Sequence, residues 1–377
     1  MSGEQVKQGY KRTEVGVIPE EWAVRPFGEL TATVASGRSK VGIAFGNYPV
    51  HGSTGVIGFC EKTEYEGDAI LIARVGANAG KLNTATGKYG VTDNTIIVRV
   101  RSDSSLSFFY RQLENKRLNS LVFGSGQPLI TGSQLKALAV CEPPLPEQHA
   151  IATALSDVNA LLNKLDQLIA KKRDLKQATM QQLLTGQTRL PGFSGEWEVK
   201  RLGEIAEIVM GQSPSSINYN RSGAGLPLIQ GNADILNRQT IKRIFTTEIT
   251  KRGKSGDVLM SVRAPVGEIS RATFDVCLGR GVCAIRYPND FLCHLLISLE
   301  PTWMRLSKGS TFDSVNSSDV RALEVNMPKE SVEQTAIATV LSDMDAELTA
   351  LEARRDKSHA LKQGMMQELL TGRIRLI

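Results

Sequence analysis

Four side chains of the type that bind zinc lie close together in the sequence: Cys277, Cys283, Cys293 and His294. Structural zinc sites usually have cysteines in close pairs, with roughly two to four residues between them, and this spacing is absent. An alignment of the two halves of the chain pairs Cys283 with Val98 and Cys293 with Phe108, which are typical core residues. We therefore interpret these cysteines as buried thiols and expect no metal site. The remaining cysteines, Cys60 and Cys141, do not complete a disulfide framework, so reduced thiols and a cytoplasmic location are expected.

Residues for nucleophilic or acid-base catalysis are also scattered. The four histidines are His51, His149, His294 and His359, and none lies in a recognisable motif with a serine or cysteine nucleophile. Asp68 and Asp257, each between a glycine and an apolar run, are interpreted as turn formers at the start of strands. We expect no catalytic residue in this chain.

Cofactor-binding motifs are incomplete. Residues 76–82, Gly-Ala-Asn-Ala-Gly-Lys-Leu, are similar to a phosphate-binding loop, but only three residues separate the glycines and no Ser or Thr follows the lysine. We predict a turn between two strands here. A self-contained methyltransferase needs an (Asn/Asp)-Pro-Pro-(Tyr/Phe) turn, whereas the Pro-Pro pair at Pro143-Pro144 leads into a helix. No cofactor is expected on this chain.

The amino-acid composition limits the class of protein to which the chain can belong. The 377 residues are 41% hydrophobic, which suits two to three folded domains. Lys and Arg outnumber Asp and Glu by 45 to 39, and this net charge of +6 is too small to indicate a polyanionic partner by itself. No stretch approaches 18 consecutive apolar residues, and the N-terminus lacks the apolar region of a signal peptide, so a soluble, unexported protein is expected.

An internal repeat organises the chain. Residues 147–190 align without gaps on residues 333–376 at an offset of 186, with 24 of 44 positions identical. The segments before each copy correspond only loosely, through Glu21-Trp22 and Glu196-Trp197 and through Gly67-Asp68 and Gly256-Asp257. The chain therefore consists of two diverged globular modules, each followed by a copy of the same segment.

The repeated segments are predicted to be long helices. Apolar residues recur at alternating steps of four and three, which is the seam of a coiled coil: Ile151, Leu155, Val158, Leu162, Leu165 and Ile169 in the first copy, and Ile337, Leu341, Met344, Leu348 and Leu351 in the second. Prolines upstream (Pro143, Pro144, Pro146 and Pro328) bar a helix before each copy, and Thr185-Gly186 and Thr371-Gly372 supply its end. Each helix spans about 39 residues, or roughly 58 Å.

The predicted fold class is α+β: two mixed α/β modules separated by two long antiparallel coiled-coil helices related by a pseudo-twofold axis. The expected boundaries are residues 1–142 for module 1, 143–190 for helix 1, 191–328 for module 2 and 329–377 for helix 2. Strands are predicted at 69–73, 95–100, 258–262 and 282–285, and shorter helices at 106–117 and 290–306. In this arrangement the modules lie at opposite ends of the helical rod, which would act as a ruler. A dimerisation hairpin without a measuring role is the alternative.

The repeat and its flanks resemble the specificity subunit of type I restriction-modification systems. Residues 143–162, PPLPEQHAIATALSDVNALL, resemble the family's segment that leads into the helix, and KQxxMQxLLTGxxRL ends both copies. Module 2 contains weaker resemblances. Residues 210–214 (MGQSP) resemble the Gly-x-Thr-Pro turn of target recognition domains, and residues 226–232 (LPLIQGN) and 256–267 (GDVLMSVRAPVG) resemble family strands. Residues 309–311 (GST), ahead of Ser317-Ser318-Asp319, are similar to the start of the family's last segment. Module 1 departs from this pattern, since Ser36-Gly37-Arg38-Ser39 lacks the proline.

This resemblance implies a non-catalytic DNA reader. Each target recognition domain would read one half of a bipartite site in double-stranded DNA, and the helices would set the spacing and dock two modification (methyltransferase) subunits. Restriction (endonuclease) subunits could be added, and S-adenosylmethionine would bind to the partner subunits, not to this chain. Two rival interpretations are a coiled-coil scaffold that holds two protein-binding modules apart and a self-sufficient methyltransferase, which the missing motifs oppose.

The charge distribution agrees with DNA binding by the modules. The two helical segments, 147–185 and 333–371, carry a net charge of −2, and the rest of the chain carries +8. A helix of roughly 58 Å corresponds to about 17 base pairs of duplex, enough for two short half-sites and a spacer. Because the modules differ so strongly, we expect an asymmetric site.

Base reading requires forked donors and acceptors presented on turns, with Arg directed to guanine and Asn or Gln to adenine. In module 1 the candidates are Arg38, Lys40, Asn47, Arg74, Asn78, Lys81, Asn94 and Gln127. In module 2 they are Gln212, Ser213, Asn218, Gln230, Asn232, Arg263, Arg280 and Thr311. Arg74 and Arg263 are expected to occupy equivalent places in the two modules.

Overall fold

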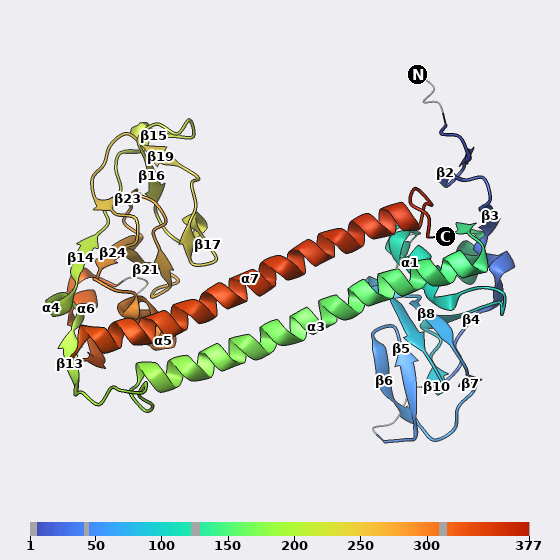
Figure 1. Cartoon of the computed structure of the whole chain (residues 1–377), viewed down its shortest axis with the longest axis horizontal. Helices are drawn as coiled ribbons and strands as arrows, with labels where there is room; N and C mark the ends of the chain where they lie inside the picture. The colour runs from blue at the N-terminus through green and yellow to red at the C-terminus, as the bar shows by residue number, and fades with distance from the viewer. Residues whose placement is uncertain (1–5, 41–44, 122–128, 309–314, 377) are drawn as a thin grey trace. The chain divides into compact units, whose positions relative to one another are not determined.

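The two long helices are continuous and begin and end close to the predicted residues. A computed structural model describes residues 6–40, 45–121, 129–308 and 315–376, with side chains left undescribed at 302–308. Helix α3 spans Leu145–Leu184 and α7 spans Ser331–Leu369 (Figure 1). Pro146 lies inside the first turn of α3, where a missing N–H leaves no hydrogen bond unmade, so it does not bar the helix there. Gly186 and Gly372 have φ of 73° and 70°, the left-handed conformation that ends a helix.

Contacts divide the chain into two units, each built from one module and parts of both helices. Unit 1 comprises residues 1–166 and 353–377, and unit 2 comprises residues 167–352. The domain boundaries predicted from the sequence cut the chain differently, at the ends of the helices, and they remain a prediction. Module 1 is therefore packed on the start of α3 and the end of α7, and module 2 on the end of α3 and the start of α7.

In its described residues, module 1 is mostly β-structure, with two short helices and three 3-10 turns. Its strands are β1 (Tyr10–Thr13), β2 (Gly16–Pro19), β3 (Ala23–Pro26), β4 (Thr31–Ser36), β5 (Tyr48–Gly52), β6 (Gly55–Cys60), β7 (Tyr65–Glu66), β8 (Ala69–Ala73), β9 (Leu82–Ala85), β10 (Lys88–Val91), β11 (Thr95–Val100) and β12 (Ala139–Glu142). Its helices are α1 (Leu106–Asn115) and α2 (Gly132–Ala137), and its 3-10 turns are η1 (Phe27–Leu30), η2 (Gly76–Asn78) and η3 (Leu118–Leu121).

Module 2 has the same character. Its strands are β13 (Trp197–Arg201), β14 (Glu207–Met210), β15 (Tyr219–Asn220), β16 (Leu226–Ile229), β17 (Ile235–Leu236), β18 (Gln239–Thr240), β19 (Phe245–Thr246), β20 (Arg252–Gly253), β21 (Val258–Ser261), β22 (Ile269–Arg271), β23 (Val276–Leu278), β24 (Val282–Arg286) and β25 (Glu324–Pro328). Its helices are α4 (Leu202–Ile205), α5 (Phe291–Lys308) and α6 (Ser317–Ala322), with 3-10 turns η4 (Ser216–Asn218) and η5 (Asn232–Asp234).

The sheets of the two modules correspond strand by strand. A core sheet has the order β4-β11-β8-β9 in module 1 and begins β14-β24-β21-β22 in module 2, where β18 and β17 extend it. A second sheet contains one parallel pair in each module, β5 with β10 and β16 with β23. Each module is closed by a pair of terminal strands, β3 with β12 and β13 with β25. The duplication therefore extends through the modules, whose sequences correspond only loosely.

The central strands are buried on both faces, which explains their continuous apolar runs. In β8, Ile70 and Ile72 face the larger core cluster, which includes α1, α3 and α7, whereas Ala69 and Leu71 face a smaller one between the sheets. Strand β21 alternates in the same way between the two clusters of module 2. A strand covered on both faces cannot show the apolar-polar alternation of a half-exposed strand.

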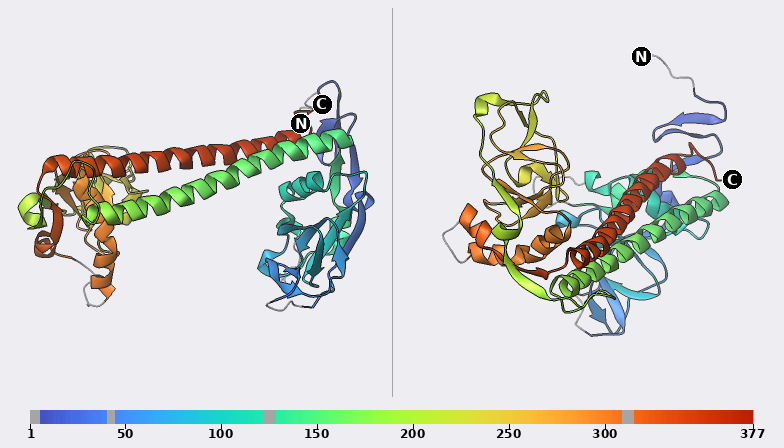
Figure 2. Two further views of the ribbon diagram at one scale, coloured as in Figure 1. Left: turned by 60° about the horizontal axis from the view of Figure 1, so that its bottom comes forward. Right: turned by 60° about the vertical axis from the view of Figure 1, so that its left-hand side comes forward.

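Within each unit the segments of α3 and α7 run antiparallel. Figure 2 shows the ribbons of α3 and α7 side by side. In unit 2, Lys172 pairs with Glu347, and the neighbouring pairs Arg173–Glu352 and Lys176–Asp345 continue the ladder along both helices. In unit 1, Ile151 and Leu155 share a core cluster with Met366 and Leu369. The predicted seam is buried in α3 except at the half-buried Val158, and in α7 at Ile337 and Leu341; Met344, Leu348 and Leu351 are half-buried.

A buried carboxylate at the start of each long helix binds an arginine that follows the other helix. Glu147 of α3 is 3% exposed and accepts two hydrogen bonds from Arg375, at 2.7 and 2.9 Å, and one from Trp22 Nε1 at 3.0 Å. Glu333 of α7 is 1% exposed and accepts two bonds of 2.6 Å from Arg189. We call these two clusters the clamps.

The guanidinium group of each clamp also lies over a tryptophan ring. Arg375 is 6.0 Å from the ring centre of Trp22, and Arg189 is 5.8 Å from that of Trp197. The hydrogen bonds that Arg375 donates to Glu147 raise the pKa of Arg375 further above its ordinary value, so the cation is present at all working pH. Each clamp thereby joins a module to the start of one long helix and the end of the other.

The cysteines lie where the sequence analysis expects them. Cys141, Cys277, Cys283 and Cys293 are buried free thiols, Cys60 is a half-buried free thiol, and burial raises the pKa of Cys283 to about 12. In module 2, Cys283 of β24 pairs with Met210, the last residue of β14. In module 1, Ile96 of β11 pairs with Ser36, the last residue of β4. Cys283 therefore corresponds to Ile96 and not to Val98. In the described part of the chain no group of three His, Cys, Asp or Glu residues could hold a metal ion, and no helix there is long and apolar enough to cross a membrane.

Replacement of Arg375 by alanine is expected to lower the free energy of unfolding by about 3–5 kcal/mol, because it leaves the buried Glu147 carboxylate without its cation. The matched control is Arg373→Ala, which removes an exposed ion pair with Glu368 and should cost under about 1 kcal/mol. Urea denaturation of the full chain measures both. Equal effects of the two substitutions would show that the clamp does not stabilise the fold.

Candidate nucleic-acid interface

Four turns of module 2 meet at one end of its core sheet. Strands β14 and β21 both run antiparallel to β24. The turn after β14 and the turn after β21 therefore lie beside the turn that precedes β24. Strands β16 and β23 are parallel, so the turn after β16 lies beside the segment after β23. The turns comprise residues 211–214, 230–232, 262–265 and 279–281.

Backbone hydrogen bonds and glycines hold these turns close together. The Gly279 N–H donates to Ile229 O at 2.7 Å, and the Val262 N–H donates to Gly281 O at 2.9 Å. A Cβ atom on Gly281 would overlap the carbonyl oxygen of Gln230, and one on Gly211 would overlap that of Gly279. Only glycine permits this approach of one backbone to the next.

Five of the eight residues predicted for module 2 line a single cavity of about 350 Å³ between these turns: Ser213, Gln230, Asn232, Arg263 and Arg280. Gly231, Ser261, Ala264 and Gly281 complete its wall. The Ser213 hydroxyl accepts from the Arg280 N–H at 3.1 Å, so it holds a turn in place. We call this cavity the module 2 cavity.

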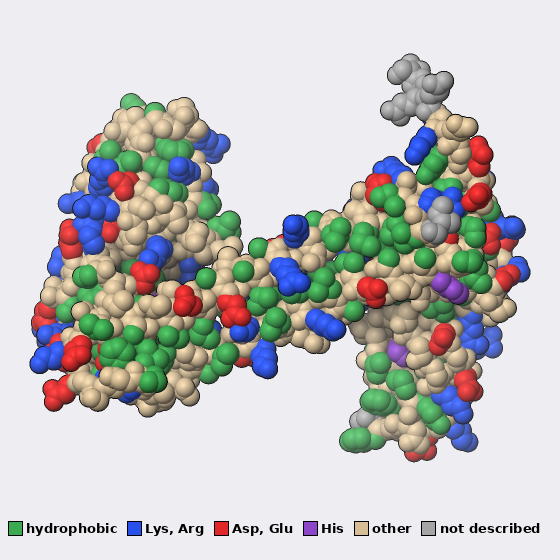
Figure 3. Space-filling view, in the orientation of Figure 1, with side chains coloured by type: hydrophobic (Ala, Val, Ile, Leu, Met, Phe, Trp, Pro, Cys, Tyr) green, Lys and Arg blue, Asp and Glu red, His purple; other side chains and the backbone are tan. Residues whose placement is uncertain are grey.

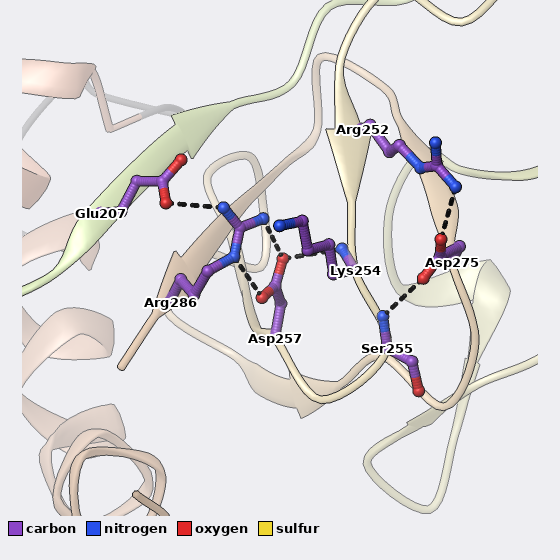
Figure 4. A network of polar contacts seen from close by, with 7 residues as sticks. All are labelled: Glu207, Arg252, Lys254, Ser255, Asp257, Asp275 and Arg286. Atoms are coloured by element: carbon purple, nitrogen blue, oxygen red, sulfur yellow. Dashed lines mark hydrogen bonds and ion pairs between the residues drawn. The ribbon is translucent and has the colours of Figure 1, made fainter. Parts of the chain in front are cut away.

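The arginines of the module 2 cavity lack the acidic partners that five other arginines of the module have. No hydrogen bond or ion pair of the Arg263 or Arg280 guanidinium occurs among the described residues, and both side chains are exposed. At the far end of the core sheet, Arg286 of β24 donates to Asp257 and Glu207 (Figure 4). Beside the second sheet, Asp275 accepts from Arg252 and from the Ser255 N–H. Arginines that stabilise the fold are thus paired, whereas those at the cavity are free to contact a ligand.

The other predicted residues of module 2 lie outside the cavity. Asn218 donates to Glu248 at 2.7 Å and therefore stabilises a turn. Gln212 is exposed beside the cavity, and its backbone N–H donates to Leu278 O. Thr311 lies outside the described residues.

In module 1, Arg38, Arg74 and Asn94 lie in the turns that correspond to those around the module 2 cavity. Arg38 lines a separate cavity of about 490 Å³ with Glu64, Tyr65 and Arg99. Arg99 was not predicted, although an arginine in the apolar run of β11 is a detectable signal.

The predicted equivalence of Arg74 and Arg263 is wrong by one residue. Asn94 directly precedes β11 of module 1, and Gly281 directly precedes the equivalent strand β24 of module 2. The carbonyl oxygen of each residue accepts a backbone hydrogen bond of 2.9 Å. The donor is Arg74 in module 1 but Val262 in module 2, so Arg263 lies one position further along. Arg74 Nη1 donates to Ser36 Oγ at 3.2 Å, which makes it in part a structural residue.

Residues 76–81 form the predicted turn, here between β8 and β9. Its N–H groups at positions 79, 80 and 81 donate to carbonyls of residues 76, 73 and 78, so they are not directed toward a phosphate. Asn78 and Lys81 line a cavity of about 450 Å³ with Arg117 and Asn119, two residues that the sequence analysis missed. Lys40 and Asn47 border residues that the structure does not describe, and Gln127 lies outside the described residues.

One serine-histidine pair appears only in the folded chain. His294 Nε2 lies 3.0 Å from Ser342 Oγ, but His294 Nδ1 is buried and has no partner. A catalytic triad needs an acid at that nitrogen to orient the imidazole. Burial lowers the pKa of His294, which keeps it neutral, and we assign the pair to packing of α5 on α7.

Comparisons with known proteins agree with this architecture. A family model described as "Type I restriction modification DNA specificity domain" matches residues 19–172 and 194–359. The MjaX specificity subunit of Methanocaldococcus jannaschii, assigned to a type I restriction enzyme, is 27% identical over 98% of this chain and 97% of its own length. The MjaVIII specificity subunit of the same organism is 23% identical over 81% of this chain and 79% of its own.

Solved structures show the same fold. The crystal structure of the S subunit of a type I restriction-modification system from M. genitalium has a TM-score of 0.70 at 18% identity, covering 93% of this chain and 96% of that one. A structure concerned with complex assembly and conformational transition of the type I system has a TM-score of 0.55 at 22% identity, covering 95% and 99%.

Substitution of Gly281 by alanine is expected to push the turns at residues 230 and 281 apart and to lower the free energy of unfolding by about 1–3 kcal/mol. Gly231→Ala is the matched control, because a Cβ there meets no atom within 4 Å. Thermal or urea denaturation measures both variants. If Gly281→Ala is as stable as Gly231→Ala, the turns are not closely packed.

Proposed function

The chain belongs to the type I restriction-modification DNA specificity family, and we propose that it reads a bipartite DNA site through its two modules. Specificity subunits are non-catalytic, so methylation and cleavage would be performed by partner chains. The module 2 cavity supports this proposal best, because it gathers unpaired arginines and carboxamides at rigid turns, as base reading requires.

The distribution of charge supports the same assignment. Lys and Arg side chains are spread over both modules on the face drawn in Figure 3, and the chain outside the long helices carries a net +8. Contacts to phosphates supply most of the sequence-independent affinity for DNA, whereas base contacts supply specificity. We propose that the modules grip the backbone over this basic surface and read bases with the turns at the ends of their core sheets.

The two half-sites are proposed to differ in sequence. The core sheets of the modules correspond, but side chains at the turns differ: Arg38 of module 1 stands where module 2 has Gln212, and Asp93 stands where module 2 has Arg280. Different donors and acceptors on the same framework recognise different bases.

The long helices are proposed to dock two modification subunits and to set the distance between the half-sites. Leu161, Leu168 and Leu175 of α3 are spaced by seven residues and are 38%, 39% and 51% exposed. Hydrophobic side chains reach the surface along the helices (Figure 3), and a heptad of exposed leucines suits a partner helix. S-adenosylmethionine would be bound by the modification subunits, and restriction subunits would join the complex for cleavage.

The complex of the full chain with a cognate modification subunit should bind duplex DNA with an affinity that falls steeply with salt. With six or more phosphate contacts, the loss is roughly 10³-fold between 50 and 200 mM salt. Fluorescence anisotropy with a labelled duplex measures it. Salt-independent binding, or none, would favour the protein scaffold instead of the DNA reader.

Lengthening the helices tests their role in spacing. Four residues inserted between Asp166 and Lys171, with a matching insertion after Glu352 on α7, add about 6 Å and should lengthen the unread spacer by about two base pairs. Mapping the methylated bases after co-expression with the modification subunit gives the site. Both half-sites should stay unchanged, and an altered half-site sequence would contradict the division of labour between helices and modules.

A further inference from the structure

The module 2 cavity contains a specific arrangement of donors and acceptors. Among the described residues, seven arginines of unit 2 bind a carboxylate: Arg173, Arg189, Arg238, Arg243, Arg252, Arg271 and Arg286. Arg263 and Arg280 do not, and both line the cavity. Two guanidinium groups beside one small cavity repel each other, and this repulsion is offset when a ligand rich in acceptors lies between them.

The backbone atoms of both arginines are fixed while their guanidinium groups are free. The Arg280 N–H donates to Ser213 Oγ at 3.1 Å, and the Arg263 carbonyl accepts from Ser261 Oγ at 2.9 Å. The side chains therefore extend from defined points, as is needed for recognition by geometry as well as by charge.

Hydrogen bonding fixes the orientation of the Gln230 carboxamide. The Tyr219 hydroxyl donates its one proton to Pro214 O at 3.1 Å, so it can only accept from Gln230. Gln230 Nε2 must therefore face Tyr219, at 3.1 Å, which leaves Oε1 of an exposed side chain free to accept a hydrogen bond.

The Asn232 carboxamide is oriented in a similar way. Its Nδ2 donates to the Glu268 carboxylate, which accepts only, and its Oδ1 is buried without a partner. The exposed side chains of the cavity thus offer two forked donors, from Arg263 and Arg280, and the Gln230 carboxamide oxygen as an acceptor.

This pattern matches a G·C base pair. In the major groove guanine presents two acceptors, N7 and O6, and cytosine presents one donor, the N4 amino group. An A·T pair presents a donor at adenine N6 where guanine has an acceptor, and that donor would face a guanidinium. Resting on the proposed DNA-reading function, we propose that the half-site read by module 2 contains a G·C pair, with Arg263 or Arg280 donating to guanine N7 and O6 and Gln230 Oε1 accepting from cytosine N4.

The test is selection of bound sequences from a randomised duplex library by the complex of the full chain with its modification subunit. The wild-type consensus should contain a G·C pair in one half-site. Arg263→Ala or Arg280→Ala should reduce the preference for that pair by roughly five- to a hundredfold and leave the other half-site unchanged. Arg263→Lys and Arg280→Lys retain the charge but lose the fork, so they should also lose the preference while keeping the salt dependence.

Arg221→Ala is the matched control, since Arg221 is an exposed arginine of the same module that does not line the cavity. It should leave the preference unchanged. A second measurement uses wild-type protein and a duplex with 7-deazaguanine at the selected position, which removes N7 alone and should weaken binding roughly tenfold.

The outcomes distinguish a failure of the guanine assignment from a failure of the proposed DNA-reading function. A uniform loss over all sequences, with the salt slope reduced by about one for each arginine, means phosphate contacts and overturns the guanine assignment while DNA reading stands. A consensus without a G·C pair, or alanine variants identical to wild type, also overturns it. Failure of the wild-type complex to bind DNA at all would instead overturn the proposed function.

Discussion

Two buried carboxylates, Glu147 and Glu333, hold the architecture together. Glu147 lies at the start of α3 and binds Arg375, which follows the end of α7. Glu333 lies at the start of α7 and binds Arg189, which follows the end of α3. Because a nearly buried carboxylate is stable only with its cation, each module must engage both helices. Each unit accordingly contains the start of one long helix and the end of the other, and the two helices run antiparallel inside it.

The clamps also explain why the sequences of the two long helices correspond closely, whereas those of the two modules correspond only loosely. A helix that packs on a module at each end and on the other helix within each unit has few free positions. The clamp residues Glu147, Arg189, Glu333 and Arg375 recur at the repeat offset of 186. The modules retain the order of their core strands while the turns at one end vary. Binding residues commonly lie on such turns, supported by a rigid sheet.

Module 2 uses arginine in two ways at opposite ends of one sheet. The half-buried Arg286 donates to Asp257 and Glu207, and this network joins β14, β21 and β24. Arg263 and Arg280, at the other end, have no acidic partner among the described residues and border a cavity lined with polar groups. Paired charges fix the sheet, and the unpaired ones remain available for the acceptors of a base.

The sequence by itself determined the duplication, the two long helices and their ends, the central strands and the absence of a zinc-type spacing, since these depend on local periodicity, proline and glycine. It also identified most residues of the module 2 cavity, because polar side chains in glycine-rich turns are visible without a structure. It could not determine which of them meet: Asn218 binds Glu248, and Arg74 and Arg263 differ in register by one residue. Only the tertiary structure decided this, because strand register and ion pairing join residues far apart in the chain, and no local pattern specifies such partners.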